Sequence, residues 1–235
     1  EQEDTLIQRR YGAIIVATGF EQMDMKRYGE YGYGQHPDVL TGLEFERFFN
    51  ASGPTGGKVV RLSDGKEPET VVFVQCAGSR DKARGANYCS RICCMYTAKQ
   101  AGLLKEKGPN AKSFVFHIDI RTAGKGYEEF QRRAAEDYDV TYLRGSVGKV
   151  FPEGDKLMVR GVDSLSGKTM EIAADMVVLA AASVARSDAP ELGRIIGINS
   201  DSYNFFNEAH PKLKPVETHT AGVFIAGACQ APKDI

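Results

Sequence analysis

Apolar runs alternate with periodic polar segments along the chain, and their lengths predict a sheet joined by crossover helices. Four runs have the length and character of buried strands: "GAIIVATG" (12–19), "TVVFVQC" (70–76), "SFVFHIDI" (113–120) and "ADMVVLAAA" (174–182). We expect one helix from Tyr88 to a stop at Gly108, and a second over residues 127–138 before a strand at residues 140–145. This β-α-β-α-β order is typical of a parallel sheet with right-handed crossovers.

Shorter patterns complete the expected order of elements. Turn residues separate "VGKVF", "KLMVRGV" and "TMEIAA" within residues 147–174, which predicts a small antiparallel insertion. Thr41 and Glu44 have the spacing of a capping box, so a short helix is expected over residues 41–50. Residues 189–197 predict another helix, and "AGVFIAGA" (221–228) predicts a last strand.

The whole order resembles the pyridine-nucleotide domain of two-dinucleotide flavoproteins. "VATGF" (16–20) resembles the strand end at which such chains leave the flavin domain, and "AGVFIAGACQ" (221–230) resembles the strand by which they return to it. We therefore expect an α/β fold: a Rossmann-like, thioredoxin-reductase-like domain of the pyridine-nucleotide-disulfide-oxidoreductase type, with the small antiparallel insertion and flanking partial FAD-domain segments. The expected division is 1–65 for a partial FAD-domain segment and linker, 66–185 for a degenerate nucleotide-type Rossmann domain carrying a cysteine cluster, and 186–235 for the return segment.

Composition and charge remove several classes of partner. The net charge of −1 gives no electrostatic reason to expect nucleic acid or an anionic membrane surface. The longest apolar runs are much shorter than the 18 or so residues that span a bilayer, so no membrane insertion is expected. No signal peptide is visible, which predicts a cytoplasmic, reducing location, and the start without Met leads us to expect an excised fragment.

Four of the five cysteines gather where the strand at residues 70–76 meets the following helix. Cys89 and Cys93 are four residues apart and would share a helix face, with Cys94 rotated by about 100°. Cys76, at the strand end, could face them across the loop. A helix N-terminus with Arg80, Arg84 and Arg91 nearby would favour an anionic group at this place.

The same loop lacks the glycine pattern of a dinucleotide site. Such a site needs G-x-G-x-x-G between strand and helix, whereas Gly78 and Gly85 are too far apart here and bulky cations intervene. Binding of NAD(P)H at the usual place is therefore disfavoured.

From the residues alone, three interpretations of the cysteines stay open. They could be four buried reduced thiols, a zinc site or an iron–sulfur cluster. The spacing C-x₁₂-C-x₃-C-C is neither a repeated zinc-knuckle pair nor the common ferredoxin run, so it does not choose among them.

Longer motifs carry a more specific resemblance. "QCAGSRD" (75–81), "YCSRICCMYTAKQA" (88–101), "IDIRTAGKGYEEF" (118–130) and "GACQAPKDI" (227–235) resemble the A-type flavoprotein subunit of heterodisulfide reductase and the related flavin subunits of the quinone-interacting membrane-bound oxidoreductase. "YGYGQHPDVLTGLEFERFFNASGPTGG" (31–57) fits as well, so the resemblance covers nearly the whole chain. It implies a [4Fe–4S] cluster held by Cys76, Cys89, Cys93 and Cys94.

The resemblance also implies a function, further cofactor contacts and partners. It implies an oxidoreductase subunit that relays electrons between FAD and partner iron–sulfur subunits. The residues that would contact the flavin are Thr18, Gly19, Gly227, Ala228 and Gln230. Positive charge near the cluster or a partner would come from Arg80, Arg91, Arg121 and Lys125. Cys229 is not counted as a cluster ligand.

The chain departs from the family pattern at the flavin site. An N-terminal G-x-G-x-x-G and a ferredoxin-type cysteine run are absent, and the sequence stops inside the terminal flavin motif. FAD is therefore expected in the full-length parent rather than in this fragment, which would not be catalytically competent alone. Two alternatives are an NAD(P)H-dependent flavin oxidoreductase domain and a zinc-stabilised interaction module.

Overall fold

The computed structural model describes residues 3–234 and divides them into two compact units. One unit, here the terminal unit, combines the segment up to Glu21 with the segment from Val184 onward; the other, the central unit, is Gln22–Ser183. The chain passes between them at the two short strands β2 (Glu21–Gln22) and β10 (Ser183–Val184), which pair with each other. Because the cysteine loop lies in the central unit, that unit is described first.

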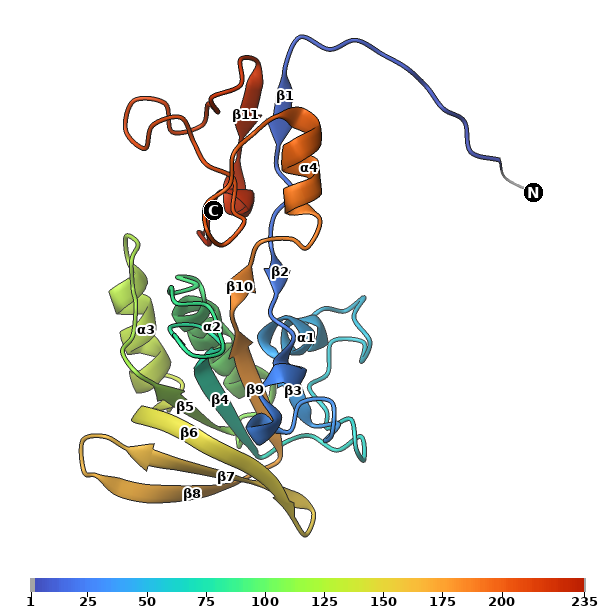
Figure 1. The fold of residues 1–235 in the computed structure, drawn as a ribbon. Helices are drawn as coiled ribbons and strands as arrows, with labels where there is room; N and C mark the ends of the chain where they lie inside the picture. The colour runs from blue at the N-terminus through green and yellow to red at the C-terminus, as the bar shows by residue number, and fades with distance from the viewer. Residues whose placement is uncertain (1–2, 235) are drawn as a thin grey trace. The chain divides into compact units, whose positions relative to one another are not determined.

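A seven-stranded sheet forms the central unit, in the order β3-β9-β4-β5-β6-β7-β8 (Figure 1). The strands are β3 (Val39–Thr41), β4 (Thr70–Ala77), β5 (Lys112–His117), β6 (Thr141–Glu153), β7 (Lys156–Asp163), β8 (Lys168–Ala174) and β9 (Met176–Ala181). Pairing is parallel from β3 to β6 and antiparallel from β6 to β8. The parallel core and the antiparallel insertion are therefore both confirmed, with the two strands predicted at 140–145 and 147–151 merged into β6.

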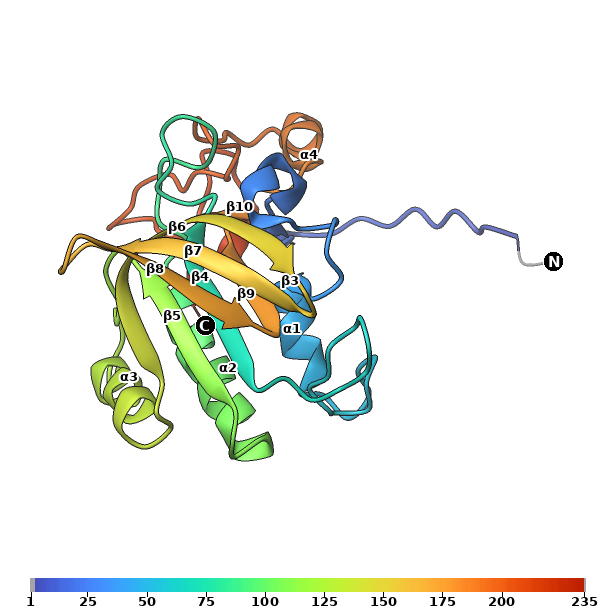
Figure 2. The ribbon, with the colours of Figure 1, turned by 90° about the horizontal axis from the view of Figure 1, so that it is seen from below.

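The sheet curls so that its antiparallel end turns back over the parallel strands. Gly161 on β7 faces the Phe116 ring of β5, although β6 separates these strands in the sheet order; a Cβ at Gly161 would lie 2.7 Å from Cε1 of Phe116. Figure 2 shows β7 and β8 running alongside β6. The curl closes one face of the central strands, which explains why β9 is buried at every position.

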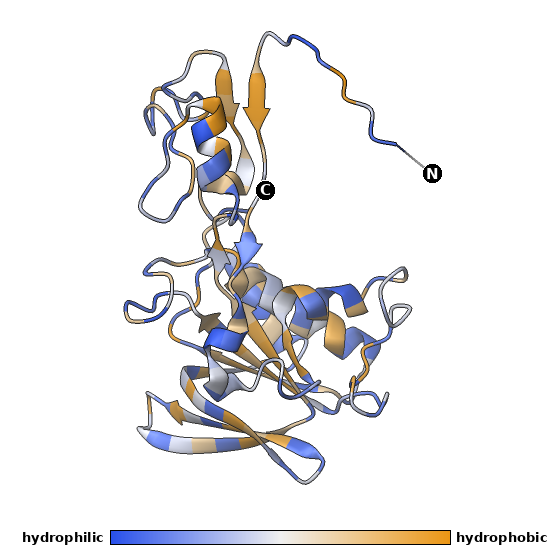
Figure 3. Ribbon diagram, turned by 45° about the vertical axis from the view of Figure 1, so that its right-hand side comes forward, coloured by the Kyte–Doolittle hydropathy of each residue, from blue (hydrophilic) through white to orange (hydrophobic). Residues whose placement is uncertain are grey.

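Helices cover the other face of the central strands. They are α1 (Gly42–Phe48), α2 (Cys93–Lys107) and α3 (Tyr127–Glu136), and α2 and α3 form the crossovers between β4, β5 and β6. Buried side chains from helices and strands, among them Phe45, Phe73, Leu104, Val115 and Met176, pack in one cluster. The hydrophobic colouring in Figure 3 follows the central strands.

Two predictions about helix starts have different outcomes. The capping box is confirmed: the Thr41 N–H donates to Glu44 Oε2 at 2.7 Å, and the Glu44 N–H donates to Thr41 Oγ1 at 3.3 Å. The helix predicted from Tyr88 is wrong at its start, because α2 begins at Cys93. Arg91 has a φ of 63°, which a right-handed helix cannot include, so Cys89 lies in the loop and does not share a helix face with Cys93.

The terminal unit is built on a parallel pair of strands. β1 (Ile14–Val16) pairs with β11 (Val223–Ile225), and α4 (Ala189–Ile196) packs with them around Val16 and Phe206. These elements confirm the strands and the helix expected in the two flanking segments.

The compact units do not follow the sequence-based division at residue 65. Residues 22–65 belong to the central unit, in which β3 forms the edge of the large sheet beside β9. The assignment of residues 1–65 and 186–235 to FAD-domain segments stays a prediction. Among residues 3–234, no helix is long and apolar enough to cross a bilayer.

Candidate functional site

The cysteine loop, residues 76–94, joins the carboxyl end of β4 to α2 and contains unusual backbone. Cys76, Arg80 and Arg91 have φ values of 58°, 59° and 63°, and the β4–β9 register shifts between Val74 and Ala77. Left-handed backbone at residues other than glycine is costly and persists only where the surroundings enforce it, most often at functional sites. Ligands of open parallel sheets bind at this carboxyl edge. A functional site is therefore expected in this loop.

The glycines of the loop close it on itself rather than leaving space for a phosphate group. The Ala86 N–H donates to the Gly78 carbonyl at 2.8 Å, and the Arg80 N–H donates to the Tyr88 carbonyl at 3.0 Å. A Cβ at Gly85 would lie 2.3 Å from the Gly78 carbonyl oxygen, so only glycine fits there. This packing agrees with the prediction that a dinucleotide is disfavoured at the usual place.

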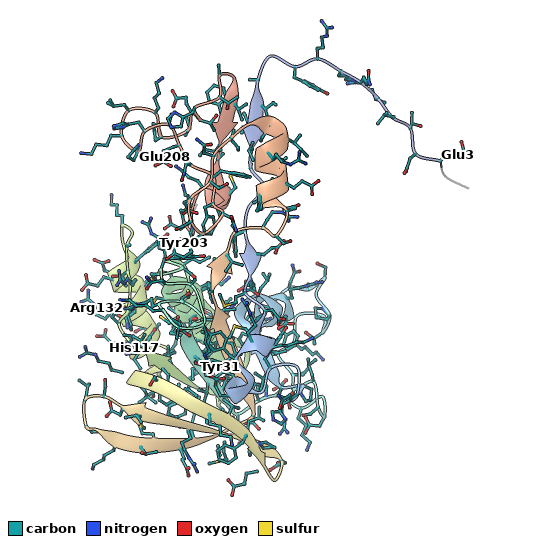
Figure 4. All side chains as sticks on the ribbon, in the orientation of Figure 1. Glu3, Tyr31, His117, Arg132, Tyr203 and Glu208 are labelled. Carbon is teal, nitrogen blue, oxygen red and sulfur yellow. The ribbon has the colours of Figure 1, made fainter. Side chains whose placement is uncertain are left out.

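Tyrosines from the segment before β3 support the loop from outside. Tyr28 donates its hydroxyl to Asp81 Oδ2 at 2.7 Å, and the Arg84 guanidinium lies 4.6 Å from the centroid of the Tyr28 ring. Arg84 also pairs with Glu30. Tyr31, labelled in Figure 4, stacks on Tyr28 with ring centroids 5.9 Å apart. These contacts hold the outer part of the loop in place.

Four free thiols meet inside this loop. Cys93 and Cys94 are buried, while Cys76 and Cys89 are partly exposed. Burial raises the pKa of Cys76 to about 11, with Cys94 as the next cause and Arg80 opposing it. Burial also raises the pKa of Cys93, and Cys94, Cys76 and Cys89 add to the effect. Each of these two thiols is thus influenced by other cysteines of the loop, while the four as a ligand set stay a prediction.

Donors and cations surround the thiols. The Arg91 N–H donates to Cys89 Sγ at 3.3 Å, and the Arg80 guanidinium, beside Cys76, donates to Asp119 Oδ1 at 2.7 Å. Arg121 pairs with the same carboxylate at 3.4 Å, and Cys94 Sγ lies 4.0 Å from the Asp119 carbonyl oxygen. Asp119 thus pairs with both Arg80 and Arg121 and holds them near the thiols. Arg91 contributes its backbone N–H while its side chain is exposed, and Lys125 is an exposed loop residue.

Two residues of this site were missed by the sequence reasoning. Asp119 follows β5 and would have required knowledge of which strand ends are neighbours. Tyr96 has a buried hydroxyl oxygen without a hydrogen-bond partner, next to the thiols. Its spacing of three residues from Cys93 on a helix is the signal that could have identified it.

The side chains do not converge on a single ion as they lie. In the part of the chain that the structure describes, no group of three or more His, Cys, Asp or Glu side chains is placed to hold one metal ion. The chemistry of the donor set is different: four unpaired thiols, N–H donors, cations and an unpartnered hydroxyl enclose one region. Thiols, N–H donors and cations are the kinds of group that suit a bound anionic group.

The residues expected to contact flavin lie together in the terminal unit. Because β1 and β11 are parallel and Val16 pairs with Ile225, the segments after both strands leave the same end of the pair. Gly19 and Gly227 have φ values of 76° and 72°. Gln230 donates its side-chain amide to Glu208 Oε2 at 2.7 Å. Thr18 and Ala228 lie within these two segments, and flavin contact by the five residues stays a prediction.

The fifth cysteine has a separate environment. Cys229 is buried in the terminal unit, where its thiol donates to the carbonyl oxygens of Val16 at 3.2 Å and Ala226 at 3.1 Å. Cys229 therefore lies in a different compact unit from the other four cysteines, and its exclusion from the ligands stays a prediction.

Comparison with known proteins gives close relatives in sequence. No family model matches the chain. The chain is 46% identical over its full length to an iron–sulfur subunit of the CoB–CoM heterodisulfide reductase of Methanopyrus kandleri, covering 36% of that protein. It is 48% identical, again over its full length and 36% of the relative, to the corresponding subunit of the H₂:CoB–CoM heterodisulfide,ferredoxin reductase of Methanothermobacter marburgensis. The chain thus spans about a third of the length of these curated relatives.

Comparison with solved structures gives the fold. Thioredoxin reductase from T. acidophilum matches with a TM-score of 0.57 and 13% identity, over 94% of this chain and 58% of that one. Thioredoxin reductase from Lactococcus lactis matches with a TM-score of 0.56 and 17% identity, over 95% and 59%. The predicted thioredoxin-reductase-like α/β fold is therefore confirmed.

Proposed function

The chain is homologous over its whole length to a segment of the A-type subunit of heterodisulfide reductase, and from this premise we propose that it carries one [4Fe–4S] cluster for electron transfer. One relative is named as an iron–sulfur subunit of heterodisulfide reductase, and the other as a subunit of a heterodisulfide,ferredoxin reductase. In the full-length protein, the cluster would relay electrons between FAD and partner iron–sulfur subunits. The protein would act in the cytoplasm, in a reducing environment.

The observation that carries this proposal is the gathering of Cys76, Cys89, Cys93 and Cys94 in one strained loop. Free cysteines are common in protein cores as small apolar residues, but a core does not require left-handed backbone at Cys76. Left-handed backbone at three residues of the loop, and the donors and cations around the thiols, support the proposal of a bound group.

When bound, the cluster would supply reversible transfer of one electron. Cys76, Cys89, Cys93 and Cys94 would hold it. Burial raises the pKa of Cys76, and the chain's own groups would partly offset this effect: the Arg80 guanidinium lies beside Cys76, and the Arg91 N–H donates to Cys89. Burial of Cys93 and Cys94 would keep water away from one side of the site.

FAD belongs to the proposal for the full-length protein. The ends of β1 and β11, with Gly19 and Gly227 in left-handed conformation, would approach the flavin by their backbone. Since the chain spans about a third of its relatives, the remaining flavin contacts would come from parts of the parent outside it.

The two alternatives have less support. An NAD(P)H site would need the space that the Gly78–Ala86 hydrogen bond and the tight approach of Gly85 fill. A single zinc ion at Zn–S distances of about 2.3 Å would require sulfurs roughly 3.8 Å apart in a tetrahedron. The sequence spacing also lacks the repeated zinc-knuckle pair that is usual for such a site.

Anaerobic reconstitution of the full chain with ferrous iron and sulfide tests the proposal. We expect about four iron atoms and four sulfides per chain, with broad visible absorption from thiolate-to-iron charge transfer that bleaches on reduction. Titration with NADH, followed by calorimetry, should show no saturable binding. Failure to retain iron, or one tightly held zinc in protein purified without added iron, would contradict the proposal, and micromolar NADH binding would favour the first alternative.

A further inference from the structure

The Tyr96 hydroxyl is a buried polar group that the fold leaves without a hydrogen bond. Tyr96 is partly exposed as a residue, but its oxygen is buried and makes no hydrogen bond of ordinary geometry to any described group. Burying a hydroxyl without a partner is costly, and most buried polar side-chain atoms in proteins have a partner. A hydroxyl in this state suggests that its acceptor is completed only when a group binds beside it.

The position of Tyr96 directs its hydroxyl toward the cysteines. Tyr96 lies in the first turn of α2, three residues after Cys93, and side chains three apart share a helix face. Helical side chains also lean toward the N-terminus of their helix, which here is the end that bears Cys93 and Cys94.

Gly42, the first residue of α1, fixes the ring in this position. A Cβ at Gly42 would lie 2.8 Å from Cε2 of Tyr96 and 3.1 Å from its hydroxyl oxygen. The backbone of Gly42 is not left-handed, so the glycine is needed for the space that the ring occupies rather than for its φ. The ring is thus packed against the start of α1, and the hydroxyl cannot turn freely to water.

The Tyr96 hydroxyl can act as a hydrogen-bond donor at this place. Cys93 is the thiol that interacts with the hydroxyl most directly. A protonated phenol beside a thiolate can donate a charge-assisted hydrogen bond to it.

We propose that Tyr96 donates its hydroxyl hydrogen bond to the Cys93 thiolate when the four cysteines hold the cluster, and that this bond raises the reduction potential. The inference rests on the proposed function. A reduced cluster carries one more negative charge than an oxidised one, so a donor to its sulfur ligand stabilises the reduced form more. Tyr96 would then tune the cluster without being a ligand, and Cys93 would be the charged acceptor, a thiolate, only in the loaded protein.

A conservative pair of variants tests the inference on the reconstituted full chain. Tyr96→Phe removes only the hydroxyl and keeps the ring beside Gly42. Tyr138→Phe is the matched control, because Tyr138 also packs on α2, at Gly102, but donates its hydroxyl to the exposed Glu106 at 2.8 Å. The readouts are iron content and the midpoint potential from a titration followed by electron paramagnetic resonance.

We expect all three proteins to retain the same iron content, with the midpoint potential shifted to a more negative value in Tyr96→Phe alone. An equal midpoint potential in Tyr96→Phe and the wild type would overturn the inference. Loss of the cluster from a folded Tyr96→Phe would also overturn it, because Tyr96 would then be needed to bind the cluster. If the wild type takes up no iron, the proposed function fails and this inference fails with it.

A second measurement does not depend on the stability of a variant. Pulsed resonance spectra of the reduced wild-type chain, recorded after exchange into heavy water, should show an exchangeable deuteron coupled strongly to the cluster. Specific labelling of the tyrosine Cζ and ring with magnetic isotopes should show the same ring in contact with the spin. Absence of any tyrosine coupling would contradict the inference.

Discussion

Cys93→Ala should abolish incorporation of the iron–sulfur cluster, whereas Cys229→Ala should leave iron content and visible absorption unchanged. Both residues are buried free cysteines, so the two substitutions remove the same chemical group from equally buried positions. They differ in place: Cys93 lies among the other three thiols of the loop, while Cys229 donates to backbone carbonyls in the terminal unit. The comparison therefore separates a ligand from an ordinary core cysteine.

The expected effect at Cys93 is large because a four-iron cluster has one thiolate for each iron. Iron content measured after anaerobic reconstitution and gel filtration should fall from about four atoms per chain to a small fraction of that. Circular dichroism should show that the fold of the unloaded variant is retained. Iron content in Cys93→Ala equal to that of the wild type would refute its assignment as a ligand.

Asp175→Asn should lower the free energy of unfolding by about 3–5 kcal/mol, the range for breaking a buried ion pair by removing one partner. Asp175 precedes β9, and its side chain is 4% exposed. It accepts hydrogen bonds from Lys156 Nζ at 2.6 Å, Arg61 at 3.2 Å, and the Glu69 and Thr70 N–H groups at 3.0 and 2.9 Å. A neutral amide would leave Arg61, itself 10% exposed, with less compensation for its charge.

The exposed pair of Arg160 and Glu171 provides the matched control for this prediction. Its atoms approach to 2.6 Å, but both side chains are about half exposed, at 53% and 45%. Glu171→Gln should therefore change the free energy of unfolding by less than about 1 kcal/mol. Urea unfolding of all three proteins measures the difference; equal effects at positions 175 and 171 would contradict the assigned role of the buried network.

The Asp175 network also predicts a pH dependence. Burial opposes ionisation of Asp175, but the hydrogen bonds from Lys156 and from backbone N–H groups outweigh it, so the pKa is lowered. A lowered pKa in the folded state means that the carboxylate stabilises the fold above its unfolded pKa of about 3.9 and loses this effect as the pH falls through the folded value. The stability difference between wild type and Asp175→Asn should thus be constant near neutral pH and shrink below about pH 4.

Local patterns in the sequence were sufficient for most of the fold. The apolar runs identified the parallel strands because strands buried on both faces are nearly continuous in apolar residues. The capping box at Thr41 and Glu44 was predictable because its two hydrogen bonds join residues three apart. The antiparallel insertion was predictable from turn residues between alternating segments.

The start of α2 could not be predicted, because it depends on contacts distant in sequence. The spacing of Cys89 and Cys93 suits a helix, yet Ser90 bonds to Ser79 at 2.7 Å and accepts the Ser183 N–H at 2.9 Å. These tertiary hydrogen bonds accompany a left-handed Arg91, and no periodicity in the sequence encodes them.

The cysteine set was predictable from the sequence, whereas its surroundings were not. Four thiols in nineteen residues are visible by inspection. Asp119 reaches the site only because β5 lies beside β4, and Gly42 faces Tyr96 only because α1 packs on α2. Likewise, the association of Arg61 with Asp175 joins residues far apart in the chain, and nothing local indicates it.

Mössbauer spectroscopy of the chain reconstituted with isotopically enriched iron is the decisive experiment, because it counts the iron environments that the four cysteines create. If the four thiolates hold one cluster, nearly all bound iron will belong to a single diamagnetic [4Fe–4S] species in the oxidised chain, converted to a paramagnetic species on reduction by one electron. Iron present only as isolated high-spin ferrous ions, or a spectrum unchanged by alanine at Cys76, Cys89, Cys93 and Cys94 together, would contradict the proposed cluster.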